Sequence, residues 1–236
     1  MNRYAHAKRM LVAIDCIIFG FDGEELDLLL IKRNFEPEKG NWSLMGGFLN
    51  EDEDLEDGAG RILYDLTGLK NIYVEQIATF GKVDRDPVER TLSVVLFALI
   101  NIKDHDQEAV KAHNAHWITL GKKPKLIFDH DIMVEKALEH LRYNAALHPL
   151  GFELLPEKFT IPQLQKLYEA IYDLELDRRN FSRKILSTKL LIDTGEKDNN
   201  STTKKANLFR LNKARYQQKF YSFWHFMPNP ALPESL

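Results

Sequence analysis

The chain has 236 residues, of which 44% are hydrophobic, so it is long enough to bury one large core or two smaller ones without disulfides. Its single cysteine, Cys16, excludes an internal disulfide; its apolar surroundings, residues 12–21, indicate core packing in a reduced compartment rather than a nucleophile. No apolar run approaches the ~20 residues that span a bilayer, and no signal peptide is recognisable, so the sequence predicts a cytoplasmic protein without a membrane partner.

The formal net charge of −3 is unevenly distributed along the chain. Residues 1–150 carry 18 basic and 25 acidic side chains, whereas residues 151–236 carry 14 basic and 10 acidic ones. Most of the basic excess lies in residues 176–219, with 12 basic against 4 acidic side chains. A local excess of this size favours a polyanion partner for the C-terminal part alone.

The first expected elements are two buried strands, 12–21 and 26–33, joined by a hairpin at Asp22-Gly23. The segment GNWSLMGG, residues 40–47, has the glycines of a tight loop. A helix follows over about residues 55–67, with Gly68 as its C-cap. Its predicted buried stripe consists of Leu55, Ala59, Ile62, Leu63 and Leu66.

Two further strands are expected at 73–80 and 91–102, and another begins within 113–117. The polar loop 81–87 between the first two is either a ligand-contacting edge or an ordinary exposed loop. A helix over about residues 130–146, capped by Asp129, completes this part of the chain.

Pro149, Gly151 and Pro156 mark residues 148–158 as a linker. The predicted organisation is therefore a domain at 1–147, a second domain at 159–227, and a disordered tail at 228–236. The aromatic segment FYSFWHF, residues 220–226, is expected to pack on the second domain or on a second subunit.

The second domain has the pattern of a winged helix-turn-helix. Thr160-Ile-Pro-Gln163 predicts a capping box at the start of one helix, and a second, basic helix follows Asp177. Phe181, Ile185 and Leu186 are expected to face inward on that helix. Strand-like residues at 190–194 and 206–211 then form the wing. The residues predicted to bind DNA are Arg178, Arg179, Asn180, Ser182, Arg183 and Lys184 on the helix, and Lys204 and Lys205 on the wing.

Residues 47–69 resemble the Nudix box, G-x5-E-x7-R-E-U-x-E-E-x-G-U, where U is a bulky aliphatic residue. Gly47, Glu53, Arg61, Leu63, Gly68 and Leu69 are in register, but the three metal-binding glutamates are replaced by Ile62, Asp65 and Leu66. Magnesium requires oxygen ligands, and aliphatic side chains supply none. The resemblance implies the Nudix α/β/α sandwich, whereas the replacements predict no catalytic residues, no metal site and no cofactor. The remaining carboxylates form either a solvated acidic first turn or a residual metal site.

A degenerate Nudix domain followed by a basic winged helix is similar to the Nudix-related transcriptional regulators. Segments such as IDCIIFGF, GKVDRDP and GFELLP resemble most the Bacteroides-type arabinose-utilisation regulator. The resemblance implies a dimeric repressor that leaves double-stranded operator DNA when a small effector binds its Nudix domain. A pentose such as L-arabinose is the favoured effector and ADP-ribose, sensed or hydrolysed, is the alternative. The effector-binding candidates are Asp15, Arg33, Asn34, Trp42, Asp84, Arg85 and Asp129.

Overall fold

The computed structural model describes residues 8–147, 154–198 and 206–216. It divides into two compact units, Met1–Tyr143 and Asn144–Leu236, and each unit is described by itself. Several predicted features therefore lie outside the described residues: most of the linker, Lys204 and Lys205 of the wing, the aromatic segment 220–226, and the tail 228–236. In the part of the chain that is described, no helix combines the length and apolarity needed to cross a membrane.

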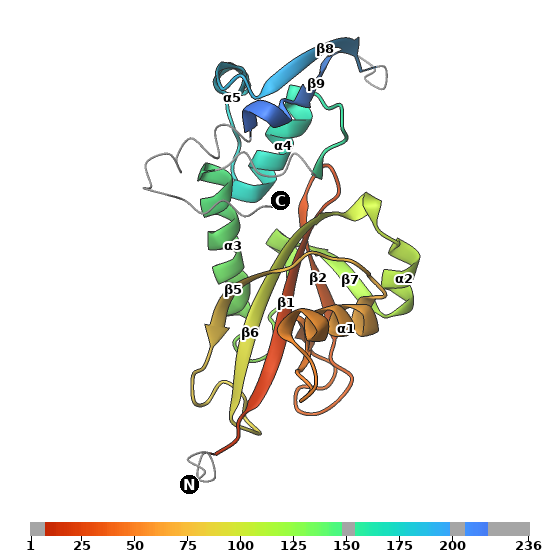
Figure 1. Ribbon diagram of the computed structural model, residues 1–236, viewed down its shortest axis with the longest axis vertical. Helices are drawn as coiled ribbons and strands as arrows, with labels where there is room; N and C mark the ends of the chain where they lie inside the picture. Colours follow the sequence, from red (N-terminus) through yellow and green to blue (C-terminus); the bar gives the residue numbers. More distant parts are fainter. Residues whose placement is uncertain (1–7, 148–153, 199–205, 217–236) are drawn as a thin grey trace. The chain divides into compact units, whose positions relative to one another are not determined.

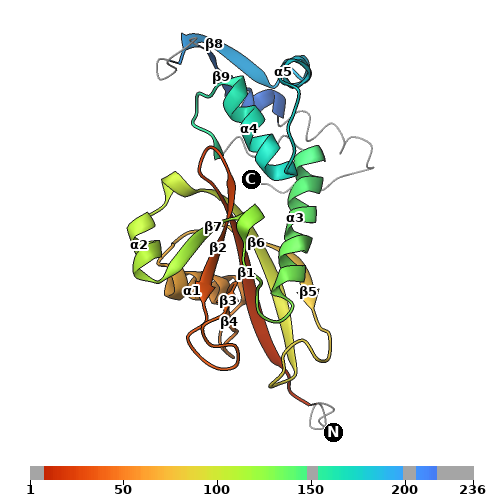
Figure 2. The ribbon, with the colours of Figure 1, turned by 180° about the vertical axis from the view of Figure 1, so that it is seen from behind.

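The first unit is built on a seven-stranded mixed sheet (Figures 1 and 2). Its strands are β1 (Leu11–Phe21), β2 (Leu26–Lys32), β3 (Trp42–Ser43), β4 (Met45–Phe48), β5 (Glu75–Phe80), β6 (Thr91–Asn101) and β7 (Ala115–Thr119). The order is β3-β2-β1-β6-β5, with β4 paired to β1 and β7 paired to β2. The central pair, β1 and β6, runs parallel from Leu11↔Thr91 to Phe21↔Asn101. Because both strands are almost fully buried, they read as continuous apolar runs.

Helices cover both faces of this sheet, as the predicted α/β/α sandwich requires. Helix α1 (Leu55–Thr67) packs Ala59, Ile62 and Leu63 into a core cluster that includes Ile14 and Cys16 of β1. Side chains alternate along a strand, so Phe19 faces the other side, where its ring contacts Phe97. Phe97 in turn contacts His140 of α3 (His130–Leu147), which covers that side.

Cys16 belongs to the core, as its sequence context predicts. Its side chain is fully buried, and this burial raises the pKa of the thiol above its ordinary value. A thiol that stays protonated is a poor nucleophile, so Cys16 contributes packing rather than reactivity.

Most predicted elements of the first unit are confirmed with small shifts. Helix α1 has the predicted bounds, and Gly68 ends it in the left-handed conformation, φ 72°. Strand β5 starts at Glu75 rather than residue 73, and Tyr73 is 86% exposed. The GNWSLMGG segment forms β3 and β4 instead of a simple loop. Helix α2 (Gln107–Ala112), which Asp106 caps, was not predicted.

The second unit contains helices α4 (Ile161–Tyr172) and α5 (Arg178–Ser187) and the hairpin of β8 (Leu191–Lys197) with β9 (Asn207–Leu211). The predicted capping box is present: Thr160 Oγ1 accepts from the Gln163 amide, and Gln163 Oε1 accepts from the Thr160 amide. Leu164, Leu167 and Ile171 of α4 pack with Ile185, Leu190 and Phe209 in the buried core of this unit. These elements form the predicted winged helix.

One orientation predicted for α5 is wrong. Ile185 is buried and Phe181 is half-buried, but Leu186 is 45% exposed. Leu186 follows Ile185 by about 100° around the helix, which turns it away from α4. The error arose because two adjacent apolar residues cannot both face the same narrow core stripe.

Candidate functional site

The segment that resembles the Nudix box lies where β4 meets α1. Of the three residues at its metal-binding positions, Ile62 and Leu66 pack into the core, whereas Asp65 is exposed. Ile62 is almost fully buried, and its Cγ1 lies only 2.9 Å from the position that a Cβ on Gly47 would occupy. Gly47 is therefore needed for the close approach of Ile62 to the β4 backbone. Leu66 is half-buried against the same core cluster.

Glu53 and Arg61, two matching residues of the box, are joined in an ion pair. Arg61 donates Nε–H and Nη2–H to the two carboxylate oxygens of Glu53, and Nη2 also donates to the Phe48 carbonyl at 3.0 Å. The Asn50 amide donates to Glu53 at 3.0 Å. The hydrogen bonds from Arg61 lower the pKa of Glu53 to about 2. The pair ties the loop after β4 to α1.

This donor set does not fit a magnesium ion. Ile62 and Leu66 offer no ligand atoms, Glu53 is already occupied by Arg61, and Asp65 is the one of the three replaced positions that presents a carboxylate. The other exposed carboxylates of α1, Glu56 and Asp57, are in its first turn, about two turns from Asp65. Within residues 8–147, 154–198 and 206–216, no group of three or more His, Cys, Asp or Glu side chains is placed to hold a metal. A hard divalent cation needs several oxygen ligands close together, which these box positions do not provide.

A pocket opens beside the box, between β1, β4 and the loops that follow β2 and β5. It contains about 510 Å³ of empty space, including the part open to solvent. Its lining is Ala13, Asp15, Arg33, Phe35, Ser43, Gly46, Gly47, Phe48, Arg85, Asp86, Thr91, Phe128 and His130. The combination of aromatic rings with a few charged groups is typical of small-molecule sites.

Arg33 forms a cationic part of this pocket wall. Its guanidinium carbon lies 3.8 Å from the ring centre of Phe35 and 5.5 Å from that of Phe128. Its Nε is buried and has no hydrogen-bond partner among the described residues. A buried donor without a partner is costly, so an oxygen acceptor on a bound molecule would stabilise this arrangement.

A network of buried charges forms another side of the pocket. Arg85 donates to both carboxylate oxygens of Asp129, at 3.0 and 2.9 Å, and its Nη2 lies 3.6 Å from Asp15. Asp15 also accepts a hydrogen bond of 2.5 Å from Ser93. Two carboxylates near one guanidinium make an anionic surface, which suits hydroxyl donors rather than phosphate.

His130, at the start of α3, completes the network in its neutral form. Its Nδ1 accepts from the Leu44 amide at 3.2 Å, and its Nε2 lies 3.6 Å from Asp15. Burial lowers the pKa of the His130 imidazole. With Nδ1 used as an acceptor, the proton of the neutral ring is on Nε2, facing Asp15.

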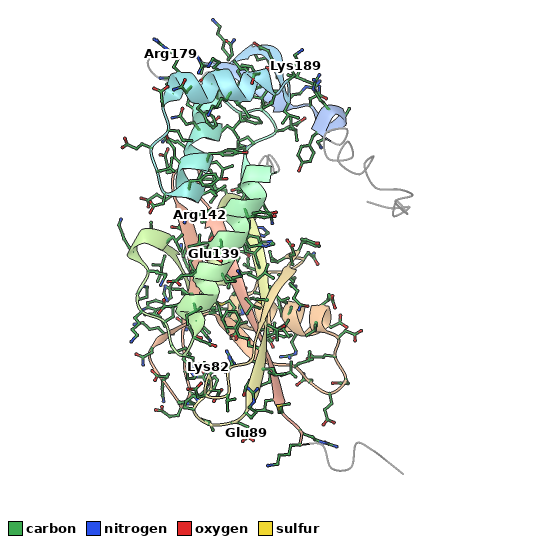
Figure 3. All side chains as sticks on the ribbon, turned by 90° about the vertical axis from the view of Figure 1, so that its left-hand side faces the viewer. Lys82, Glu89, Glu139, Arg142, Arg179 and Lys189 are labelled. Carbon is green, nitrogen blue, oxygen red and sulfur yellow. The ribbon has the colours of Figure 1, made fainter. Side chains whose placement is uncertain are left out.

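Helix α5 provides the second candidate site, a basic surface. Asp177 caps the helix by accepting from the Asn180 amide at 2.7 Å, and the helix itself contains no acidic residue. Arg178, Arg179, Arg183 and Lys184 are exposed, and Lys189 follows the end of the helix; Figure 3 shows Arg179 and Lys189 toward its two ends. Arg183 donates to Asn180 Oδ1 at 2.7 Å, which fixes its direction on the helix surface. Such a face matches the charge of a phosphate backbone.

Two family models match separate parts of the chain, one part with the pocket and the other with helix α5. A family model described as "NUDIX domain" matches residues 9–135, and one described as "NrtR DNA-binding winged helix domain" matches residues 151–211. The Acinetobacter baylyi "ADPR responsive transcriptional repressor NtrR" is 34% identical over 190 residues, which is 79% of this chain and 76% of that protein. The chain belongs to the NrtR family of Nudix-domain transcriptional regulators.

Solved structures extend the similarity to the NrtR family. Shewanella oneidensis NrtR in complex with a 27mer DNA is 30% identical with a TM-score of 0.72, covering 87% of this chain and 95% of that one. The NUDIX domain of the same protein complexed with ADP ribose is 30% identical with a TM-score of 0.51, covering 60% and 94%. An ADP-ribose pyrophosphatase of Methanocaldococcus jannaschii is 33% identical over 57% of this chain and 77% of its own length. These relatives do not support the narrower resemblance to an arabinose regulator.

The structure brings together only part of the predicted effector site. Asp15, Arg33 and Arg85 line the pocket, and Asp129 holds Arg85 from behind. Asn34, Trp42 and Asp84 are not among the lining residues. Trp42 packs edge-on against His116 with ring centres 5.5 Å apart. Asp84 is exposed and pairs with Lys82 at 3.3 Å.

Sequence reasoning named three of the 13 lining residues, and Phe35, Phe128 and His130 are among those that it missed. Phe35 is an aromatic residue exposed in a loop, which is an unusual place for a large apolar side chain. The sequence shows this phenylalanine between Asn34 and Glu36 in a polar segment, which was the signal that could have identified it. Phe128 and His130 lie about 90 residues further along the chain, and no short-range pattern connects them to Arg33.

Proposed function

We propose that this protein is a transcriptional repressor that binds operator DNA through its winged helix and responds to ADP-ribose held uncleaved in the pocket beside β4. The observation that carries the proposal is the packing of Ile62 onto Gly47, which removes a metal position while leaving the neighbouring pocket open. The chain thus retains a place for a ligand without the ligands for the catalytic cation.

The chemistry of the pocket favours a nucleoside diphosphate sugar over a free pentose. Arg33 presents a guanidinium with an open donor, flanked by Phe35 and Phe128. Phosphate oxygens are strong acceptors for guanidinium, and an adenine ring can stack on aromatic side chains. L-arabinose could offer hydroxyl donors to the side of Asp15, as the riboses of ADP-ribose also could, but it has neither the charge nor the aromatic group that the side of Arg33 suits. The ADP-ribose response of the Acinetobacter relative and the ADP ribose complex of Shewanella NrtR support the same choice.

Calorimetry with ADP-ribose and L-arabinose in parallel tests the effector. We expect ADP-ribose to bind and L-arabinose to give no heat. Arg33→Met, which keeps the apolar stem but removes the cation, should weaken ADP-ribose roughly 10- to 100-fold, the value of a hydrogen bond to a charged group. Lys39→Met is the matched control, since Lys39 is an exposed cation of the same loop outside the lining. Binding of L-arabinose without ADP-ribose would instead restore the pentose assignment.

Gel shift with promoter fragments from neighbouring genes tests the DNA-binding half. We expect the full chain to shift at least one fragment at moderate salt and ADP-ribose to weaken that shift, because an effector acts through its differential affinity for the free and DNA-bound forms. Folded protein that shifts no fragment would contradict repression through this winged helix. A shift that ADP-ribose strengthens would contradict release by the effector.

Residual hydrolysis is a second candidate, favoured by the retained Glu53 and Arg61 pair and by the archaeal pyrophosphatase relative. It predicts magnesium-dependent conversion of ADP-ribose to AMP and ribose 5-phosphate that Glu53→Gln abolishes. Our proposal predicts no conversion by either protein. Turnover by the wild type alone would establish the enzyme.

A homodimer is part of the same proposal. Winged helices of this type read two half-sites spaced by about one helical turn of DNA when they act as dimers. Light scattering of the full chain, alone and with operator DNA, measures this directly. A strict monomer on DNA would remove this part of the proposal.

A further inference from the structure

Leu186 is the one large apolar side chain of α5 that the fold leaves on the helix surface among the described residues. A single exposed leucine on an ordinary surface needs no explanation. Leu186, however, lies on the cationic side of α5, the most basic of the helices that the structure describes. Its neighbours one turn earlier are Ser182 and Arg183, and Arg179 lies two turns earlier on the same side.

The surroundings of Leu186 narrow the class of partner that can cover it. Arg179 and Arg183 are both exposed, and α5 carries no acidic side chain to neutralise them. A partner that covers this face must therefore be anionic yet must offer a small apolar group at one point. A phosphate backbone supplies the charge, and in the major groove of DNA the 5-methyl of thymine is the apolar group.

We infer that Leu186 contacts the 5-methyl group of one thymine in each half-site and is a specificity-determining residue for operator DNA. The inference rests on the proposed function, because it takes α5 as the helix that enters the major groove. Arg183, held by Asn180, lies three residues before Leu186, which is about 4.5 Å along the helix axis. The thymine therefore lies one or two base pairs from the base that Arg183 reaches.

Replacement of single thymines by deoxyuridine tests this contact, since it removes only the methyl group. The probe is the duplex that full-length wild-type protein selects from a random-sequence library. At one thymine per half-site, deoxyuridine should weaken wild-type binding about fourfold, which corresponds to ~0.8 kcal/mol for one buried carbon. Leu186→Ala should lose about the same affinity on the thymine duplex and nothing further on the deoxyuridine duplex.

Two variants serve as controls. Leu174→Ala changes a leucine of the same unit that is 48% exposed but lies outside α5, so it should bind both duplexes as the wild type does. Leu186→Met keeps an apolar side chain and should retain the preference for thymine. Because Leu186 is exposed, its replacement should leave the thermal unfolding of the protein unchanged.

The outcomes separate this inference from the proposed function. If the wild type selects no DNA sequence, both fail. If it selects a sequence but every deoxyuridine duplex binds as tightly as its thymine counterpart, the contact with a methyl group is refuted and DNA binding stands. Equal sensitivity of wild type and Leu186→Ala to deoxyuridine also refutes it, as does a change of oligomeric state in Leu186→Ala without a change of base preference.

Discussion

At the scale of single residues, two charged side chains that match the Nudix box stabilise the local structure. Glu53 and Arg61 are in register with the Nudix box, yet they bind each other and the backbone of Asn50 and Phe48 rather than a metal. The side chain of Glu53 is only 14% exposed, so water screens the pair incompletely. The pair therefore contributes to the stability of the fold in a way that depends on pH.

Glu53→Gln should remove this pH dependence. The folded pKa of about 2 lies below the ordinary value of 4.5, so ionised Glu53 stabilises the fold above about pH 4.5, and this stabilisation is lost as the pH falls toward 2. Urea unfolding at several pH values should show a constant difference between wild type and variant from pH 7 to 5, shrinking below pH 4.5. Glu51→Gln, at a side chain that is 97% exposed, is the control and should show no such trend.

Arg85→Ala should destabilise the first unit strongly. Arg85 is buried between Asp129 and Asp15, and its removal leaves two carboxylates without their cation. We expect a loss of about 3–5 kcal/mol in the free energy of unfolding, measured by denaturant titration. Lys82→Ala in the same loop, visible in Figure 3, removes a cation that is 80% exposed and should change stability by less than about 0.5 kcal/mol. If Arg85→Ala lowered the free energy of unfolding as little as Lys82→Ala does, the buried network would not be stabilising.

At the scale of elements, α5 depends on its first turn as well as on its packing. Asp177 accepts from the Asn180 amide and places a negative charge at the positive end of the helix. Because the face of α5 is crowded with cations that repel one another, this cap is one of few interactions that favour the helix locally.

Asp177→Ala should therefore loosen α5. We expect the protection of the α5 amides against hydrogen exchange to fall by about 1 kcal/mol, the usual contribution of a side-chain cap. Asp177→Asn keeps the hydrogen bond and should retain most of the protection. Equal loss in both variants would assign the effect to the charge of Asp177 rather than to capping.

The sequence predicted elements well and their contacts less well, for physical reasons. The hairpin of β1 and β2, helix α1 with Gly68, and the capping box of α4 follow from local periodicity and turn chemistry, which act over a few residues. The pairing of Arg85 with Asp129, 44 residues apart, depends on how the chain returns across the sheet. The exposure of Leu186 depends on where α4 lies. Neither is encoded in a local pattern.

At the scale of the whole molecule, acidic and basic side chains are distributed unevenly along the chain. The part of the chain before residue 151 is acidic and the part after it is basic, so the two halves differ in their attraction to a polyanion. An acidic first part limits nonspecific binding to DNA, and a basic second part supplies the attraction that the winged helix requires.

The salt dependence of DNA binding measures how much the basic part of the chain contributes to this attraction. If Lys184 neutralises one phosphate, Lys184→Ala should reduce the slope of log K against log salt concentration by about 1 and weaken all DNA sequences alike. Lys136→Ala, an exposed lysine on α3 of the first unit, is the matched control and should leave the slope unchanged. An unchanged slope in Lys184→Ala would place that lysine away from the backbone of the DNA.

The close packing of Ile62 on Gly47 also makes position 62 unfavourable for a carboxylate. A glutamate returned to position 62 would be stripped of water among Ile14, Leu63 and their neighbours, with no cation to receive it while Leu66 remains. Each single exchange would weaken the fold before it supplied a ligand to a cation. A magnesium site at these positions would thus require several simultaneous exchanges.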